Sequence, residues 1–559
     1  MQHYPWLKSY PAGMRWDTDL PVHPLFVLLD EAEDRYPQRI AIDFMGRKIN
    51  YTELARDVRA LASGLRRLGV GRGVNVGLLM PNCPQFVTSY YAVLKAGGTV
   101  VNYNPLYSQH EIEHQIKDSS TEIMITLALK ATYPKVAECL DRSPLKRIIV
   151  SEFQEALPLA KRLAFPIARK NDIAQLPHND PRHTRYDELL ASPEVAPETI
   201  HPESDIALLQ YTGGTTGVPK GAVLTHANLY ANTIQCGIWF TGLKKGEEII
   251  MGALPLFHVF AMATVMNLAV HTGSTMILHP RFDLKAILHD IQAKRPTLMP
   301  GVPTMFAAMQ NFRDVNKYDL TSLKMCISGG GPLPSEIQKS FEQRTGCRLI
   351  EGYGLTECSP VASANPLFGT NKEGTIGIPF PGTIMEVVDP DKPDKVLGVR
   401  EVGEICIRGP QVMHGYLHQL DETNRMLRGG RLHTGDIGFM DEDGYFTIID
   451  RLKEMIISGG YNIYPRNIEE ALYKHPAVAE AAVIGVFHPQ RVQVPKAFVV
   501  VKEGMTVTEG QLREHLKADI AAYAMPASYE FRESLPKSMI GKILKKELVA
   551  QERAKAANG

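Results

Sequence analysis

One short segment, residues 211–221, combines residue types that suit the binding of a polyphosphate. Its sequence, YTGGTTGVPKG, contains three threonines, four glycines and one lysine. Glycines let consecutive backbone N–H groups converge on an anion, and the hydroxyl and ammonium groups supply further donors. A plain turn would be served better by Asn, Asp and Pro than by so many threonines. The segment is not a Walker A loop, because Lys220 is followed by glycine rather than by Ser or Thr. We therefore expect a polyphosphate-binding loop rather than an ordinary surface loop.

Composition limits the classes of protein to which the chain can belong. Its 559 residues exceed what one hydrophobic core normally holds, so we expect more than one domain. The 61 basic and 61 acidic residues balance, which argues against a general nucleic-acid binder. The seven cysteines include no C-x-x-C pair, which argues against a disulfide framework or a zinc site and favours a reducing compartment. The sequence shows neither a secretory signal nor a run of 18 apolar residues, so we expect a cytoplasmic protein.

The pattern of apolar residues predicts an α/β fold. Apolar residues recur at helical spacing over residues 51–68, and a strand (74–79), a helix (84–94) and another strand (98–101) follow. This alternation favours mostly parallel sheets flanked by helices. Residues 151–201, rich in Pro and His, are expected to be the least regular part of the chain.

The domain boundaries come from the second half of the sequence. Closely spaced strands near residues 387, 404–408 and 445–449, with the turn sequence DEDG, indicate a smaller β-rich subdomain. The clearest joint is DRLKEM, residues 450–455, which precedes the Gly-rich ISGGYNIYP. After it come a helix (466–474), two strands (479–486 and 496–501) and a helix (509–521), enough for a separate core. We therefore predict a large N-terminal domain (1–449), a hinge (450–455) and a small, mobile α/β C-terminal domain (456–559).

The motifs together resemble those of the adenylate-forming acyl-CoA synthetases. YTGGTTGVPKG is followed, in the order of that family, by EGYGLTE (351–357), LHTGD (432–436), DRLKEMIISGG (450–460) and PKSMIGK (536–542). Gly213 and the stretch GPQVMHGY (409–416) look closest to bacterial long-chain fatty-acid–CoA ligases. The resemblance implies that a fatty acid and ATP give an acyl-adenylate and pyrophosphate, and that coenzyme A then takes the acyl group. It also implies Mg²⁺ as a cofactor.

Lys542 is the strongest candidate for a catalytic cation. A carboxylate that attacks an α-phosphate brings two anions together, so the reaction needs a fixed positive charge. Taken alone, a lysine here would be an ordinary surface residue, but the PKSMIGK context resembles that of the family's catalytic lysine. The resemblance also implies catalytic roles for Thr356 and Glu357. Glu357 would contact Mg²⁺ together with Thr215, because magnesium uses few protein carboxylates beside phosphates and water.

The remaining nucleotide contacts also follow from the resemblance. Asp436 would accept hydrogen bonds from the ribose hydroxyls, and Arg451 would donate to the same nucleotide. The glycines of SGGGPLP (328–334) would form a bare wall beside the adenine and the acyl head group, although a simple turn explains them too. The expected cofactor-binding residues are Thr212, Gly213, Gly214, Thr215, Thr216, Gly217, Lys220, Gly329, Gly330, Gly331, Gly352, Tyr353, Gly354, Thr356, Asp436, Ile448, Arg451, Lys453, Gly459, Gly460 and Asn462.

Two features allow either a functional or a structural interpretation. His258 resembles a residue near the carboxylate and the thiol entrance, yet a lone histidine in an apolar stretch is usually a core residue. Met262, Val265, Met266 and Ala269 form a helical stripe that suits ordinary core or a tunnel for an alkyl chain.

The hinge predicts alternating conformations. One site must release pyrophosphate and then admit a thiol, so a swing at residues 450–453 would replace Lys542 with the Gly459–Gly460 loop. Five positions depart from the family pattern: Arg431, Asn467, Val492, Gln493 and Ala524. These departures concern the coenzyme A contacts and not adenylation.

The sequence leaves the acid, the acceptor and the location partly open. An aryl acid, a dicarboxylate half-ester or a carrier-protein thiol would fit the same scaffold, and a non-catalytic nucleotide-binding relative is the alternative from another class. LPLAKRLAFPIARK (157–170) is basic and partly amphipathic, which suits contact with the inner face of a membrane or a solvated excursion, and Pro158 and Pro166 are expected to interrupt any helix. A homodimer is also left open.

Overall fold

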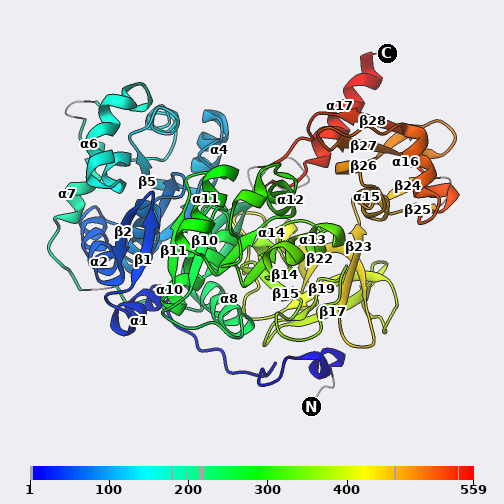
Figure 1. Ribbon diagram of the computed structural model, residues 1–559. Coiled ribbons are helices and arrows are strands. Elements are labelled where there is room, and N and C mark those ends of the chain that lie inside the picture. Colours follow the sequence, from blue (N-terminus) through cyan, green and yellow to red (C-terminus); the bar gives the residue numbers. More distant parts are fainter. Residues whose placement is uncertain are drawn as a thin grey trace.

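The computed structural model describes residues 4–177, 180–196, 198–212, 219–458, 461–538 and 541–558. Two mixed, mostly parallel sheets and a β-rich subdomain form a large body, and the C-terminal part lies apart on one side of it, beyond β23 (Phe446–Arg451) (Figure 1). This arrangement confirms the predicted α/β class. No helix in the described ranges is long and apolar enough to cross a membrane.

The first large sheet carries the predicted polyphosphate segment at one side. Its eight strands run in the order β20-β9-β8-β4-β3-β5-β6-β7, parallel from β8 to β7 and antiparallel at β9 and β20. The strands are β3 (Asn75–Leu79), β4 (Thr99–Asn102), β5 (Thr121–Leu127), β6 (Arg147–Ser151), β7 (His183–Arg185), β8 (Ile206–Thr212), β9 (Lys220–Thr225) and β20 (Gly415–Tyr416).

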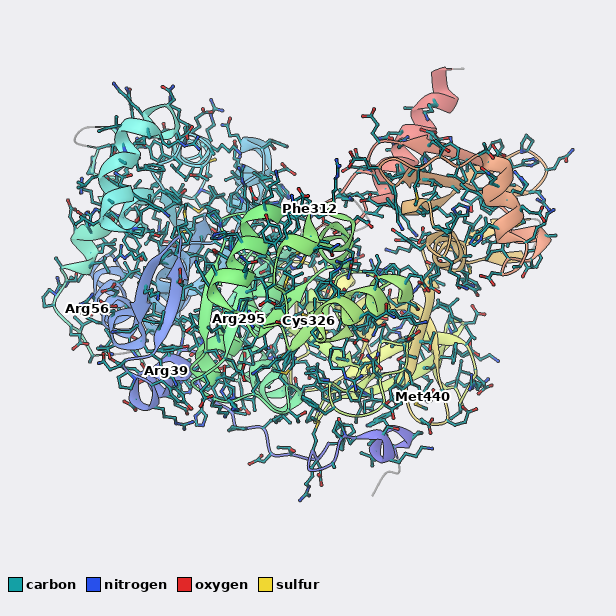
Figure 2. All side chains as sticks on the ribbon, in the orientation of Figure 1. Arg39, Arg56, Arg295, Phe312, Cys326 and Met440 are labelled. Carbon is teal, nitrogen blue, oxygen red and sulfur yellow. The ribbon has the colours of Figure 1, made fainter. Side chains whose placement is uncertain are left out.

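The second large sheet has nine strands in the order β16-β15-β14-β13-β12-β10-β11-β1-β2. Strands β14 to β1 pair in parallel, and β15, β16 and β2 add antiparallel edges. Cys326, labelled in Figure 2, lies on β13, and all seven cysteines are buried and free. The strands are β1 (Ile40–Phe44), β2 (Arg47–Asn50), β10 (Ile249–Gly252), β11 (Thr275–Leu278), β12 (Leu298–Gly301), β13 (Met325–Ser328), β14 (Arg348–Gly354), β15 (Val361–Ala364) and β16 (Ile378–Pro379).

Helices form where the apolar spacing predicts them. In α2 (Tyr51–Arg67) the Asn50 side chain and Glu53 form a capping box, and Leu54, Val58 and Leu61 are buried on one face. The other long helices of the large body are α1 (Val27–Arg35), α3 (Pro84–Lys95), α4 (Gln109–Ser119), α8 (His226–Trp239), α11 (Leu284–Lys294), α12 (Pro303–Asn311) and α13 (Ser335–Thr345).

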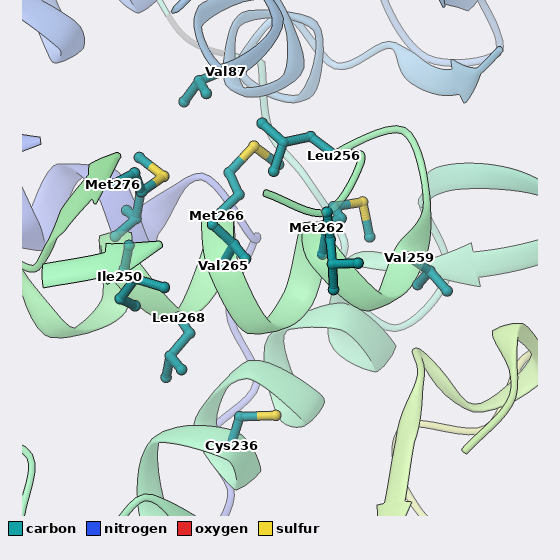
Figure 3. Close-up of a cluster of buried hydrophobic side chains, with 14 of the residues drawn as sticks. Val87, Cys236, Ile250, Leu256, Val259, Met262, Val265, Met266, Leu268 and Met276 are labelled. Carbon is teal, nitrogen blue, oxygen red and sulfur yellow. The ribbon is translucent and has the colours of Figure 1, made fainter. Parts of the chain in front are cut away.

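The Met-rich stripe lies in the core. A π-helix, Met262–Asn267, connects α9 (Val259–Ala261) to α10 (Leu268–Thr272). Met262, Val265 and Met266 are fully buried (Figure 3). Around them gather Val87 of α3, Cys236 of α8, Leu256, and Ile250 and Met276 of the second sheet (Figure 3). The stripe therefore contributes to core packing.

The β-rich subdomain and the C-terminal part have the predicted strands. The subdomain consists of β17 (Ile384–Asp389), β18 (Lys392–Val396), β19 (Gly403–Arg408), β21 (Leu427–Arg428), β22 (Arg431–Met440) and β23, with α14 (Leu420–Met426) beside it. The C-terminal part contains β24 (Ile456–Ser458), β25 (Tyr461–Ile463), α15 (Pro465–Tyr473), β26 (Val478–His488), β27 (Val492–Val501), α16 (Glu509–Leu516), β28 (Ser528–Arg532) and α17 (Lys545–Asn558).

The irregular region contains a helix that the sequence analysis did not expect. α6 (Leu159–Ala168) runs through Pro166 and begins directly after Pro158. Pro158 is tolerated because it precedes the first turn, and Pro166 lies in the last turn, where losing one backbone N–H interrupts little of the helix. The expectation that these prolines interrupt any helix was wrong for Pro166, which lies within α6. A second short helix, α7 (Tyr186–Leu190), follows β7.

One strand residue has a backbone conformation that suits glycine. Val492, at the start of β27, has a φ of +71° and is 64% exposed. A β-branched residue at positive φ is strained by about 1–3 kcal/mol, which exceeds the entropic cost of glycine. Val492→Gly is therefore expected to raise the free energy of unfolding by about 1 kcal/mol in urea denaturation. Val494→Gly, at a buried position of the same strand, should lower it instead. A Val492→Gly protein no more stable than the parent would refute the strain.

Candidate active site

The polyphosphate segment spans a hairpin connection. Thr212 ends β8 and pairs with Lys220, the first residue of β9. Gly213, Gly214, Thr215, Thr216 and Gly217 lie outside the described residues. The Lys220 ammonium forms an ion pair with Glu422 of α14 and lies 5.6 Å from the ring centre of Tyr416. Lys220 and Arg425 together lower the pKa of Glu422 to about 2. The lysine of the predicted segment is thus held at the end of the hairpin.

Glu357 lies close to this hairpin. It sits in a short 3₁₀ turn, Thr356–Cys358, that follows β14, and it is buried. Its Oε1 accepts a hydrogen bond of 2.5 Å from the Tyr416 hydroxyl, and Tyr416 pairs with Ala222 of β9. Burial and the Glu357 charge raise the pKa of Tyr416. No ion pair of Glu357 occurs with any residue that the structure describes, so this buried carboxylate has no protein cation of its own there.

Asp436 is held from two directions. The Tyr353 hydroxyl donates to its Oδ2 at 2.6 Å, and the Nε of Arg451 donates to its Oδ1 at 3.0 Å. Asp436 on β22 and Arg451 on β23 are partners across the ladder, and Asp436 is only 2% exposed. The charge of Asp436 raises the pKa of Arg451. This pair fixes an oriented carboxylate at the joint between the subdomain and the C-terminal part.

The glycines of EGYGLTE are required by the packing of the protein itself. A Cβ atom at Gly354 would lie 1.7 Å from the carbonyl oxygen of Pro360, and one at Gly352 would lie 2.7 Å from Ile327 Cδ1. In SGGGPLP, which joins β13 to α13, a Cβ atom at Gly329 would lie 2.9 Å from the Phe260 ring, and Gly330 has a φ of +77°. Packing and backbone conformation therefore explain Gly329, Gly330, Gly352 and Gly354 without a ligand, whereas a Cβ atom at Gly331 would meet only Pro303 Cγ, at 4.0 Å.

Lys542 reaches the large body from the C-terminal part. The Thr304 hydroxyl of α12 donates a hydrogen bond to the carbonyl oxygen of the neighbouring Gly541 at 3.1 Å. A Cβ atom at Gly541 would lie 2.3 Å from the Thr304 hydroxyl oxygen. The charge of Arg451 and burial lower the pKa of Lys542 to about 8, against the opposing charges of Glu454 and Asp436. The lysine ammonium therefore lies within electrostatic reach of the Asp436–Arg451 pair.

His258 belongs to the same neighbourhood. Burial, and then the charge of Lys542, lower its pKa to about 4, so the ring is neutral at pH 7. Its Nδ1 is buried and has no hydrogen-bond partner within the described ranges. A half-buried, neutral imidazole near the lysine, with Nδ1 unpartnered among the described residues, suits a polar contact with a ligand better than a satisfied core histidine would.

The remaining predicted residues are half-buried, exposed or outside the described residues. Ile448 is half-buried on β23, and Thr356 is half-buried in its turn. The Lys453 side chain is largely exposed. Its partial burial, and then the charges of Arg425 and Lys220, lower its pKa, so Lys453 lies on the side of the hairpin. Gly459 and Gly460 lie outside the described residues, as does the side chain of Asn462 on β25.

Sequence reasoning missed a buried ion pair between the two parts. Arg466 of α15 lies 3.8 Å from Glu351 at the end of the second sheet, and both side chains are buried. Burial raises the pKa of Glu351 to about 7, with Arg466 opposing that rise. The backbone N–H of Arg466 also donates to Asp450 Oδ2 at 3.1 Å. Glu351 opens the EGYGLTE motif, but nothing in the sequence marked Arg466 as its neighbour.

A second cluster of side chains packs against the LHTGD segment (432–436) and holds it in place. Glu404, Cys406 and His433 form the one group of potential metal ligands among the described residues. However, Arg428 Nη2 lies 3.2 Å from His433 Nδ1, so a cation is already present. Glu404 lies 2.8 Å from that same Nδ1 and accepts from the Gly435 N–H at 2.9 Å. The cluster is therefore a hydrogen-bonded support for the strand that carries Asp436.

The residues that depart from the family pattern lie in different parts of the structure. Arg431 donates to Glu386 at 2.6 Å within the subdomain. Asn467 and Ala524 both line a cavity of about 410 Å³ on the C-terminal part, together with Tyr464, Lys474 and Tyr523. None of these positions contacts Asp436 or Glu357.

Comparisons with known proteins agree with this arrangement. The family model described as AMP-binding enzyme matches residues 29–417, and the AMP-binding enzyme C-terminal domain matches residues 467–542. A long-chain-fatty-acid–CoA ligase of Bacillus subtilis (strain 168) is 42% identical over 98% of both chains, and one of Escherichia coli O157:H7 is 36% identical over 99% of both. A feruloyl-CoA synthase of an Amycolatopsis species is 35% identical over 92% of this chain and 96% of its own.

Solved structures show the same fold. The anthranilate CoA ligase AuaEII in complex with anthranoyl-AMP superposes with a TM-score of 0.86 at 26% identity, over 97% of this chain and 100% of its own. ATP-bound MatB from Rhodopseudomonas palustris superposes with a TM-score of 0.83 at 28% identity, over 95% and 99%. The motif order, the gathered charges and both family matches lead to one conclusion: the chain belongs to the family of AMP-binding enzymes.

Proposed function

We propose that this enzyme activates a medium- or long-chain fatty acid with ATP and transfers the acyl group to coenzyme A. The observation that carries the proposal is the position of Lys542, a cation brought from the far end of the chain to the Asp436–Arg451 pair. The relatives named long-chain-fatty-acid–CoA ligase support the choice of acid, since they match nearly the whole chain. Acyl-CoA ligases of this family use ATP and coenzyme A as substrates.

The proposed roles follow the geometry of the described side chains. Residues 212–220 would hold the polyphosphate, and Lys220 at the end of this hairpin would contribute a positive charge. Asp436 would accept hydrogen bonds from the ribose hydroxyls, since Arg451 and Tyr353 already orient its carboxylate. Lys542 would contact the fatty-acid carboxylate and the α-phosphate together. That contact offsets the repulsion between two anions as the new bond forms.

A magnesium site fits the chemistry around Glu357. One carboxylate oxygen is held by Tyr416, and the carboxylate forms no ion pair with a described residue, so its negative charge is left for a ligand. Mg²⁺ binds through one or two carboxylates together with substrate phosphates and water. Glu357 and Thr215 would hold the ion, with Thr356 beside them. When bound, the ion neutralises charge on the phosphates of ATP.

We further propose a hinge at residues 450–455 between domains at 1–449 and 456–559. Polar contacts join the two parts: Arg466 lies 3.8 Å from Glu351, and the Thr304 hydroxyl donates to the Gly541 carbonyl oxygen at 3.1 Å. The hinge itself is held by the Arg466 backbone N–H, which donates to Asp450, and by Lys545, which lies 3.0 Å from Glu454. Polar contacts of this kind can exchange partners when a domain swings. A swing would withdraw Lys542 and bring Lys453, Asn462 and residues 459–460 toward coenzyme A. The half-reaction assays of Lys542 variants described below test this separation.

Partners and location follow from the same proposal. The proposed partners are a fatty acid, ATP and coenzyme A, with no role for nucleic acid. Seven free, buried cysteines fit the reducing conditions of the cytoplasm.

An aryl acid is the second candidate, because the feruloyl-CoA synthase and the anthranilate CoA ligase share the sequence pattern and the fold. Acid-dependent pyrophosphate release over a panel of acids distinguishes the two. The panel would contain saturated fatty acids of 8 to 18 carbons, ferulate, anthranilate and a dicarboxylate half-ester. We expect the highest kcat/KM within the fatty-acid series. A preference for ferulate or anthranilate would contradict the fatty-acid assignment while retaining the adenylation chemistry.

A further inference from the structure

α6 presents an apolar face to solvent. Leu159, Leu163 and Ile167 are 73%, 68% and 84% exposed, and the helix contains no buried residue. They are spaced four residues apart, so that each lies about 40° around the helix from the last, on one continuous side. Figure 1 places α6 at the outer edge of the large body, far from the C-terminal part.

The opposite side of the helix anchors it to the protein. Phe165 is half-buried, and its ring lies 5.2 Å from that of Phe153. The Lys161 ammonium donates to the Met45 carbonyl oxygen at 2.7 Å. The Met45 side chain, in the turn between β1 and β2, is itself 40% exposed. α6 is thus held in a defined orientation, and the outward direction of its apolar side is fixed.

The segment that carries this face has a net positive charge. Residues 156–171 contain four basic residues, Lys161, Arg162, Arg169 and Lys170, and no acidic residue. Arg162 and Lys170 are exposed, and Arg169 is paired with Asp172 at 3.6 Å. A helix with exposed leucine and isoleucine side chains, bordered by cations, is suited to the boundary between lipid headgroups and acyl chains. Basic side chains near such a surface are attracted by anionic lipids.

We propose that α6 docks the enzyme on an anionic phospholipid surface, with Leu159, Leu163 and Ile167 inserted among the lipids and Arg162 and Lys170 at the headgroups. The net positive charge of the helix selects this occupant, because exposed cations beside an apolar face complement phosphate headgroups. This inference goes beyond the proposed catalysis, which uses none of these residues.

The test is co-sedimentation of the full-length protein with vesicles. Vesicles of phosphatidylcholine alone are compared with vesicles that also contain phosphatidylglycerol, at low and high salt. We expect binding to the anionic vesicles, a decrease of at least about tenfold for Leu163→Glu/Ile167→Glu, and a loss of the anionic preference for Arg162→Glu/Lys170→Glu. The matched control is Val396→Glu/Val402→Glu in the β-rich subdomain, where both valines are similarly exposed, at 47% and 46%. This control should bind like the parent.

Three outcomes would overturn the proposal. In the first, the parent protein does not sediment with anionic vesicles. In the second, the Leu163→Glu/Ile167→Glu protein sediments as much as the parent. In the third, the parent binds no lipid but forms a concentration-dependent dimer that this variant abolishes. The last would assign the face to a second copy of the chain. Pyrophosphate release by each variant is also measured without lipid. This assay distinguishes a failure of docking from a failure of the proposed enzyme activity.

Discussion

Lys542→Ala is expected to slow acyl-adenylate formation by at least about a hundredfold, which corresponds to about 2.7 kcal/mol of transition-state stabilisation. Lys542 lies close enough to Arg451 and Asp436 for their charges to shift its pKa. In the proposed mechanism, removing it would leave the approach of the carboxylate to the α-phosphate without its positioned cation. The measurement is fatty-acid-dependent pyrophosphate release in the absence of coenzyme A.

The second half-reaction provides the internal comparison for this variant. Thioester formation from supplied acyl-adenylate and coenzyme A should change by less than about tenfold, because the proposed swing of the C-terminal domain would withdraw Lys542 before the thiol attacks. Lys546→Ala removes an exposed lysine four residues away and should leave both half-reactions unchanged. Equal losses in the two half-reactions of Lys542→Ala would contradict the hinge, and normal adenylation would contradict the assignment of the lysine.

The pH dependence of adenylation should report the same residue. The pKa of Lys542 is lowered to about 8, so the free enzyme loses this positive charge as the pH rises through 8. Because kcat/KM reflects ionisations of the free enzyme, kcat/KM for adenylation should fall above about pH 8. Lys542→Arg keeps its charge at higher pH, so any residual activity of this variant should lack that decline.

Glu357→Gln is expected to reduce adenylation by about a hundredfold and to raise the Mg²⁺ concentration for half-maximal rate by at least about tenfold. The substitution keeps the shape of the side chain and a carbonyl oxygen for the Tyr416 hydroxyl, but it removes the only charge that the buried group offers to a cation. Pyrophosphate release measured over a series of Mg²⁺ concentrations at fixed ATP separates weaker metal binding from a slower chemical step.

Tyr416→Phe is the matched comparison for Glu357. It removes the 2.5 Å hydrogen bond to Glu357 and retains the carboxylate charge, so we expect a smaller loss, of about tenfold, from poorer orientation. If Glu357→Gln and the parent protein share the same Mg²⁺ dependence, the carboxylate does not hold the ion.

The local elements were predictable because short-range patterns determine them. α2 follows from its apolar spacing and its capping box, and the predicted strand at 74–79 appears as β3 (Asn75–Leu79). The predicted helix over 509–521 ends earlier, as α16 at Leu516. After it, Asp519 pairs with Lys474 of the neighbouring helix at 2.7 Å, a tertiary contact that no local pattern encodes.

The candidate site residues could be named from the sequence one by one, but the contacts between them could not. Asp436 and Arg451 stand in motifs, and the antiparallel pairing of β22 with β23 brings them together. The contact of Tyr416 with Glu357 depends on β20 joining the edge of a sheet whose other strands come from the first half of the chain. The buried Glu351–Arg466 pair depends on how the C-terminal part docks. Sequence spacing contains no information on such long-range placements.

The most direct test of the central claim is the detection of enzyme-bound fatty acyl-adenylate by mass spectrometry after incubation with fatty acid, ATP and Mg²⁺ but without coenzyme A. The account predicts acyl-adenylate and pyrophosphate in equal amounts for the parent protein, and neither above background for Lys542→Ala. ATP consumption that begins only when coenzyme A is added, or acyl-adenylate at parental levels in Lys542→Ala, would contradict it.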